Sequence, residues 1–346
     1  MIIKAGKTGE AAFSSVCFPS SFNEHSEPCL RGETAKRSAS EEAIFKVLPT
    51  RFQSGIACCF SEPERYGNIE ELRFRVGRPV QLITSKGEIM LMQYGSFTSK
   101  DAGEMLNSVC ECSVYSKEHE LIRGFVTLSG GARVGLCGEP LIENGNIKYF
   151  SKISSFNIRV PRELIGCAKD SVKLLFDGER PHSSIIAAPP GMGKTTFLRD
   201  LARCVSDGLG LSRAWKVAVA DERYELTGAY EGVPMLNVGK RTDVIAGIPK
   251  VRSIPLLIRN MSPEVIITDE LFGGDELGCV FEAAKCGIAI IASMHARTEA
   301  DLLAREGIRE LLDGGLINAY LLRRAYGRLA FSPIEPIAVF GGGNDA

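Results

Sequence analysis

The stretch Ala188-Pro189-Pro190-Gly191-Met192-Gly193-Lys194-Thr195 decides the fold of this chain. It has the spacing of a phosphate-binding loop, with Ala188 in place of the first glycine of that pattern. An apolar run, SIIAA over 184–188, precedes the loop, and a helical pattern follows it. A loop between a buried strand and a helix start presents its backbone N–H groups to a phosphate. The stretch therefore predicts a nucleotide site.

The residues of this loop have separate expected roles. The Lys194 ammonium would reach the β and γ oxygens of ATP, and the Thr195 hydroxyl would bind Mg²⁺. ATP and Mg²⁺ are accordingly the expected cofactors. The full set of expected nucleotide-binding residues is Pro190, Gly191, Met192, Gly193, Lys194, Thr195 and Thr196.

A second apolar run, VIIT over 265–268, ends in two adjacent carboxylates, Asp269 and Glu270. At the carboxyl end of a strand, Asp269 is placed to hold Mg²⁺. Glu270 beside it can polarise the attacking water as a general base. This pair predicts Mg-dependent hydrolysis of the nucleotide.

Two further strand ends contribute candidates. The run 217–220 precedes Asp221-Glu222-Arg223 and lies in the chain between the phosphate loop and Asp269, as in the RecA/AAA-like branch of these ATPases. Because ligands gather beyond the carboxyl ends of parallel strands, Glu222 competes with Glu270 for the role of base, and both stay open. The strand 288–292 leads to His295, which we expect to sense the γ-phosphate.

An arginine supplied by a neighbouring subunit can neutralise charge on the γ-phosphate. Sequence spacing does not choose among the five candidates, which are Arg133, Arg159, Arg162, Arg241 and Arg259.

The rest of the chain predicts a smaller α+β domain before the parallel sheet. Strand-like alternation over 69–84 and the capping box that begins at Ser38 support it. We divide the 346 residues into a poorly ordered extension over 1–37, an α+β domain over 38–150, a linker and interface segment over 151–180, and a RecA/AAA-like P-loop ATPase domain over 181–346.

Composition limits the possible partners. The net charge is −1, from 41 basic and 42 acidic residues, so no direct nucleic-acid partner is expected. The longest apolar stretch, 287–294, is far shorter than the roughly 20 residues that span a bilayer. The 11 cysteines show no zinc spacing and indicate free thiols in a reducing compartment. These features predict a cytoplasmic protein.

Several further motifs resemble those of the stage III sporulation protein AA family, from roughly residue 40 to 325. In the N-terminal part they are Ile69-Glu70-Glu71-Leu72-Arg73-Phe74-Arg75, Gly124-Phe125-Val126-Thr127-Leu128 and Gly130-Gly131-Ala132-Arg133-Val134-Gly135. In the C-terminal part they are Thr195-Thr196-Phe197-Leu198-Arg199-Asp200, Asp221-Glu222-Arg223, Arg241-Thr242-Asp243-Val244 and Ile258-Arg259-Asn260-Met261-Ser262-Pro263-Glu264. The chain departs from the family pattern at Ala132, where histidine is usual, and at Leu271-Phe272-Gly273-Gly274.

That family is similar to the ATPases of type II and type IV secretion systems. The resemblance implies that Asp221-Glu222-Arg223 corresponds to their acidic box and His295 to their histidine box. It also implies a homohexameric ring and membrane-embedded sporulation or secretion-type subunits as partners. The expected location is the mother cell, peripheral to a membrane channel. Two alternatives remain: a nucleotide-dependent scaffold without turnover, and a DNA-handling RecA-like ATPase.

Overall fold

The computed structural model describes residues 37–111, 117–143, 145–177, 180–325 and 328–334. The predicted extension over 1–37 therefore lies outside the described residues, apart from Arg37.

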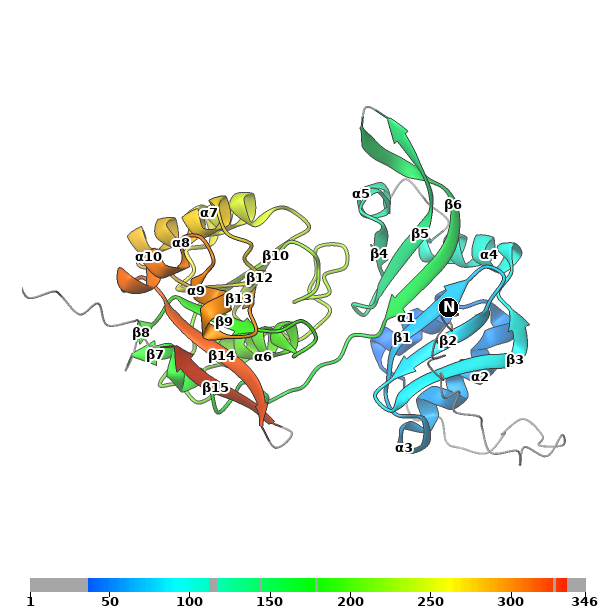
Figure 1. The fold of residues 1–346 in the computed structure, drawn as a ribbon, viewed down its shortest axis with the longest axis horizontal. Helices are drawn as coiled ribbons and strands as arrows, with labels where there is room; N and C mark the ends of the chain where they lie inside the picture. Colours follow the sequence, from blue (N-terminus) through cyan, green and yellow to red (C-terminus); the bar gives the residue numbers. More distant parts are fainter. Residues whose placement is uncertain (1–36, 112–116, 144, 178–179, 326–327, 335–346) are drawn as a thin grey trace, which may run out of the picture. The chain divides into compact units, whose positions relative to one another are not determined.

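The N-terminal part of the described chain is an α+β domain built on one antiparallel sheet (Figure 1). Its strand order is β3-β2-β1-β6-β5-β4. The strands are β1 (Ile69–Arg75), β2 (Pro79–Thr84), β3 (Gly87–Ser96), β4 (Phe125–Thr127), β5 (Arg133–Glu143) and β6 (Asn146–Arg159). The helices are α1 (Ala39–Val47), α2 (Thr50–Ser61), α3 (Pro63–Tyr66), α4 (Ser99–Val109) and α5 (Glu118–Ile122).

Local sequence signals account for most of these elements. Ser38 caps α1 and forms the predicted capping box with Glu41. Leu72 and Phe74 of β1 and alternate residues of β2 are buried, as the alternation over 69–84 predicts. Helix α4 begins at Ser99 because Thr98 caps it through a second capping box with Asp101. The helix ends at Val109, and Cys110 is its C-cap.

The sequence analysis ends this domain at residue 150, but strand β6 extends past that residue. Strand β6 pairs with both β1 and β5 and continues through residue 150 to Arg159. A boundary at residue 150 would cut this strand, so we propose that the α+β domain ends at Arg159.

The backbone at Gly130 packs closely against the start of α1. Its φ is +85°, and a Cβ added there would lie 2.6 Å from the backbone nitrogen of Ser40 at the start of α1. We expect Gly130→Ala to lower the free energy of unfolding by about 3 kcal/mol, through backbone strain and overpacking together. The matched control is Gly145→Ala, which has φ +78° and open space around its Cβ, and should cost about 1 kcal/mol. Urea denaturation measures both; equal losses would show that the contact with α1 contributes nothing.

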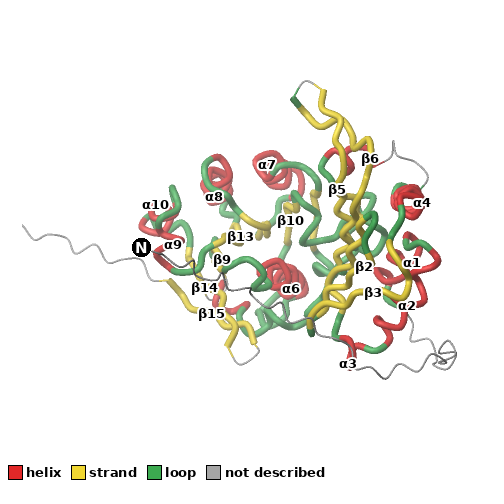
Figure 2. The backbone as a smooth tube through the Cα atoms, turned by 45° about the vertical axis from the view of Figure 1, so that its right-hand side comes forward, coloured by secondary structure: helices red, strands yellow, loops and turns green. Residues whose placement is uncertain are grey.

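The C-terminal part is a seven-stranded sheet with helices on both faces (Figure 2). The strands are β9 (Ser184–Ala188), β10 (Val217–Asp221), β11 (Thr242–Ala246), β12 (Val265–Glu270), β13 (Ala289–His295), β14 (Asn318–Ala325) and β15 (Arg328–Ile334). The helices are α6 (Lys194–Asp207), α7 (Lys250–Met261), α8 (Asp275–Lys285), α9 (Glu299–Leu303) and α10 (Ile308–Asp313). A 3-10 helix, η2 (Val172–Leu175), and a short hairpin of β7 (Phe176–Asp177) and β8 (Arg180–Pro181) precede them.

The strand order is β11-β10-β12-β13-β9-β14-β15, with only β15 antiparallel to its neighbour. Every residue of β9 and β10 is buried, as expected for strands covered on both faces. Although β10 lies between β9 and β12 in the chain, the strand that separates β9 from β12 in space is β13. Strand β13, which carries His295, therefore lies directly between β12 and β9, the strand that leads into the phosphate loop.

Among the described residues, no helix combines the length and apolar character needed to cross a membrane.

Candidate functional site

The carboxyl ends of β9, β10, β12 and β13 converge at one edge of the parallel sheet. His295 at the end of β13 is paired in register with Ala188 at the end of β9. Glu270 at the end of β12 is paired with Ser293 of β13. This register brings the phosphate loop, the acidic pair and the histidine to the same place.

The loop after β9 has the backbone that a phosphate cradle requires. Gly191 has φ +74° and Gly193 has φ +92°, a region of backbone conformation that glycine adopts without strain. Helix α6 begins directly after Gly193, at Lys194. Thr195 and Thr196 are half-buried in its first turn, and Pro190 is exposed. The N–H groups at this helix start are placed to bind an anion.

The Lys194 side chain folds back over the loop that precedes it. Its Nζ donates to the carbonyl of Ala188 at 2.9 Å and to that of Pro189 at 3.1 Å, and lies 2.7 Å from Nδ1 of His295. The side chain is buried, and burial lowers its pKa while the Glu270 carboxylate opposes this effect. All three N–H bonds of the ammonium therefore have partners inside the protein.

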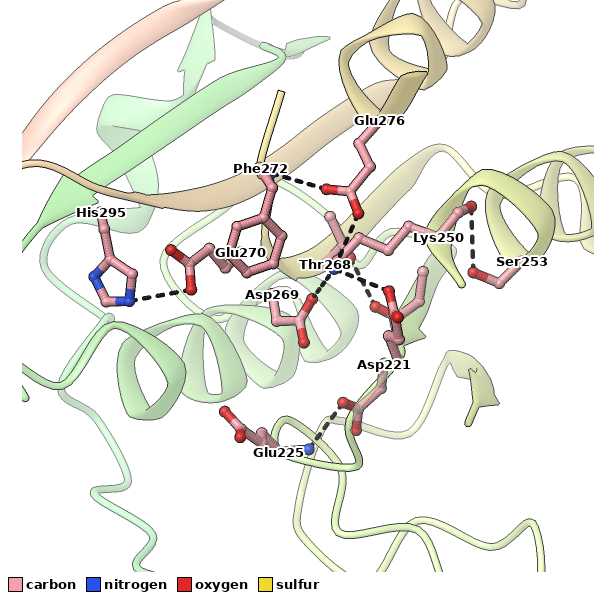
Figure 3. A network of polar contacts seen from close by, with 12 residues as sticks. Asp221, Glu225, Lys250, Ser253, Thr268, Asp269, Glu270, Phe272, Glu276 and His295 are labelled. Atoms are coloured by element: carbon pink, nitrogen blue, oxygen red, sulfur yellow. Dashed lines mark hydrogen bonds and ion pairs between the residues drawn. The ribbon is translucent and has the colours of Figure 1, made fainter. Parts of the chain in front are cut away.

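His295 connects this lysine to the acidic pair. Since the Lys194 ammonium can only donate, Nδ1 of His295 accepts, and the ring proton belongs on Nε2. Nε2 then donates to Oε2 of Glu270 at 3.1 Å, the contact drawn in Figure 3. A continuous chain of polar contacts thus runs from Lys194 through His295 to Glu270.

A bulge near the end of β12 directs its two carboxylates to different partners. Ile267 pairs with Ile291 but Glu270 pairs with Ser293, so β12 has one extra residue over this interval. An extra residue changes the direction in which the following side chains point. Glu270 faces His295, whereas Asp269 faces Lys250 (Figure 3).

Asp269 has the properties of a metal ligand. It is buried, and its Oδ1 forms an ion pair with the Lys250 ammonium at 3.0 Å and has no other donor among the described residues. Burial raises the pKa of Asp269 to about 7, and the Lys250 ammonium opposes the rise. A buried oxygen with a free lone pair fits Mg²⁺. In the described part of the chain, no group of three or more His, Cys, Asp or Glu forms a metal site by itself.

Asp221, the last residue of β10, and Glu222, which follows it, have different partners. Asp221 is fully buried and accepts from Glu225 N at 2.9 Å, Thr227 N at 2.8 Å and Thr227 Oγ1 at 2.6 Å. Burial raises the pKa of Asp221, and the hydrogen bonds from Thr227 oppose this. Asp221 therefore closes the turn, while Glu222 extends to Lys250 at 3.3 Å.

The candidate arginines differ in how firmly they are held. Arg133 forms an ion pair with Glu225 at 3.1 Å, and Arg162 forms one with Glu70 at 3.2 Å. Arg159 is 61% exposed and lies 3.7 Å from Glu71. Arg241 donates to the carbonyl of Ser206, and Arg259 is exposed in the last turn of α7. Exposure favours Arg159, Arg241 and Arg259 for contact with another molecule.

Sequence reasoning missed Lys250 and Glu276. Lys250 is 1% exposed and contacts three carboxylates at the edge of the site. A signal was present: Lys250 is the first residue of α7, where the helix dipole disfavours a cation. A lysine at that position needs compensating carboxylates nearby.

The sheet order, the phosphate loop after β9 and the acidic pair ending β12 define a P-loop NTPase fold of the RecA/AAA type. Two solved structures share it. The Legionella pneumophila ATPase DotB is 14% identical with a TM-score of 0.52, over 82% of this chain and 81% of that chain. The pilus retraction motor PilT with bound ADP is 16% identical with a TM-score of 0.54, over 81% of this chain and 82% of that chain. At these identities the likeness concerns the fold alone.

The sequence relatives define the family. The profile of the family "Sporulation stage III, protein AA" matches residues 39–329. Stage III sporulation protein AA of Bacillus subtilis (strain 168) is 37% identical over 286 residues, which are 82% of this chain and 91% of the relative. The chain therefore belongs to the stage III sporulation protein AA family, as the motifs predicted.

Proposed function

We propose that this protein is a Mg-dependent ATPase that drives or regulates a membrane transport complex during sporulation. The observation that carries the proposal is the contact chain from Lys194 through His295 to Glu270. It joins the residue expected to bind the γ-phosphate to the residue expected to activate water. Such a connection serves hydrolysis, whereas nucleotide binding alone does not require it.

The contacts indicate how nucleotide binding prepares the site. A triphosphate in the loop offers Lys194 phosphate oxygens, which are stronger acceptors than the carbonyls of Ala188 and Pro189. Lys194 then turns away from His295, and Nδ1 of the imidazole becomes free to accept from another donor. Through this exchange, His295 couples the presence of the γ-phosphate to the position of Glu270. Glu270 orients the attacking water and accepts its proton.

Mg²⁺ would be held by Asp269 and Thr195, and when bound it neutralises charge on the phosphates. We assign the general base to Glu270 because its partner His295 contacts the phosphate-loop lysine. Glu222 is instead engaged by the buried Lys250 ammonium. This leaves Glu222 in a supporting role.

We further propose that the chain acts as a homohexameric ring on the cytoplasmic side of a membrane complex. The support is the family membership and the fold shared with DotB and PilT. In such a ring, one of the exposed arginines, Arg159, Arg241 or Arg259, would reach the nucleotide of the neighbouring subunit.

The test is phosphate release from ATP as a function of protein concentration. Activity per chain should rise with concentration as subunits associate, and EDTA should abolish it. Sedimentation of the same samples gives the oligomeric state at each concentration. Full activity per chain in samples that sediment as monomers would contradict the shared site, and absence of hydrolysis at every concentration would contradict the ATPase proposal.

A further inference from the structure

Lys250 is a buried cation to which the proposed reaction assigns no role. Lysine is rarely buried unless its charge is compensated. Here the side chain is 1% exposed and begins α7, where no acidic residue of the helix's own first turn compensates it. The helix dipole opposes a cation at this end. Something other than helix stability therefore accounts for a lysine at this position.

Its partners come from three separate elements. The ammonium lies 3.0 Å from Oδ1 of Asp269 at the end of β12, 3.3 Å from Oε2 of Glu222 after β10, and 3.8 Å from Oε1 of Glu276 in the first turn of α8. Figure 3 shows the lysine reaching this position from the start of α7. The ring of Phe272 lies 5.5 Å from Nζ, beside the cluster. The charge of Lys250 thus lies inside a group of carboxylates.

The position of the ammonium is significant because Asp269 is the proposed metal ligand. Nζ lies 3.0 Å from Oδ1, which has no other donor among the described residues. A divalent cation on Asp269 would come within a few ångströms of that ammonium, and two like charges so close repel strongly in a buried site. Glu222 and Glu276 offer the ammonium an alternative place when a metal arrives.

We propose that Lys250 is the internal counter-ion of the carboxylates around Asp269. In this role it keeps divalent cations off Asp269 until nucleotide phosphates arrive with the metal. Without nucleotide, the lysine neutralises the carboxylates and a metal gains little by displacing it. With nucleotide, phosphate oxygens add ligands and negative charge, so the metal binds Asp269. The Lys250 ammonium then shifts toward Glu222 and Glu276. Lys250 is therefore a positioning residue, which acts on the metal through Asp269. The inference rests on the proposed function only in taking Asp269 as the metal ligand.

The experiment measures Mn²⁺ binding to the nucleotide-free protein, using electron paramagnetic resonance to detect free Mn²⁺. Lys250→Met should bind Mn²⁺ at least about tenfold more tightly than wild type, which corresponds to about 1.4 kcal/mol. Lys250→Arg keeps the charge and should behave as wild type. The control Lys285→Met removes an exposed lysine of α8 that pairs with Glu282, and should also leave Mn²⁺ binding unchanged.

Removal of Lys250 leaves buried carboxylates without compensation, so Lys250→Met is combined with Glu276→Gln in a second variant that restores the charge balance. That variant retains Asp269 and Glu222 and should also bind Mn²⁺ more tightly than wild type. Equal Mn²⁺ affinity in wild type and either folded methionine variant would overturn the proposal.

The wild type can overturn the proposal even if neither methionine variant folds. Nucleotide-free wild type should bind no stoichiometric Mn²⁺. Stoichiometric binding that Asp269→Asn abolishes would overturn the proposal, because the metal would reach Asp269 with Lys250 in place. None of these measurements requires ATP turnover, so failure of the ATPase proposal and failure of this one give different results.

Discussion

Lys194→Ala is expected to lower the rate of ATP hydrolysis by at least about 10²-fold, the usual size of the effect when a charge-stabilising donor is lost. Lys194 is the one cation that the described structure places in the phosphate loop, and its ammonium is held within hydrogen-bond distance of that loop's own carbonyls. With alanine, the loop retains its N–H groups but has no cation for the β- and γ-phosphates. Phosphate release and the binding of a fluorescent ATP analogue measure the two consequences.

The control for this variant is Lys285→Ala, which removes a lysine that is 70% exposed on α8 and should leave hydrolysis unchanged. Circular dichroism checks that both variants fold. If Lys194→Ala is folded and hydrolyses ATP at the wild-type rate, the phosphate loop is not the site of hydrolysis.

Glu270→Gln is expected to reduce kcat by about 10²- to 10³-fold while nucleotide affinity stays within about threefold of wild type. Glutamine has the shape of glutamate, and its amide oxygen can still accept from Nε2 of His295, so the contact chain to Lys194 survives. The amide cannot take a proton from water. The variant therefore separates proton transfer from site geometry.

Glu222→Gln is the matched comparison, because Glu222 is the other candidate for the base. Its carboxylate faces Lys250, which keeps Asp269 and Glu276 as partners, so we expect a loss of hydrolysis of no more than about tenfold, well below that of a lost general base. Single-turnover hydrolysis with bound ATP compares the two directly. The reverse order, with Glu222→Gln inactive and Glu270→Gln nearly unimpaired, would transfer the assignment to Glu222.

Much of the candidate site could be predicted from local patterns. The phosphate loop needs glycine where φ is positive, and Gly191 and Gly193 occupy those positions. Short apolar runs followed by acids predicted where β10 and β12 end. Each of these signals depends on residues adjacent in the chain, and so a single sequence carries them.

Other features depended on contacts between distant residues. Whether Asp221 or Glu222 faces the site is decided by the turn that Thr227 closes around Asp221. The separate directions of Asp269 and Glu270 result from a bulge visible only in the pairing of β12 with β13. The domain end that we propose at Arg159 rests on the pairing of β6 with β1, a strand more than 70 residues earlier.

By itself, then, the sequence determined the phosphate loop after β9, the strands that lead to it and the family to which the chain belongs. The tertiary structure alone decided that β13 lies between β9 and β12, that His295 joins Lys194 to Glu270, and that Lys250 is buried among carboxylates. The physical reason is the range of the interactions. Backbone conformation and hydrophobic periodicity act over a few residues, whereas the partner of a buried charge is set by which strands and helices pack together.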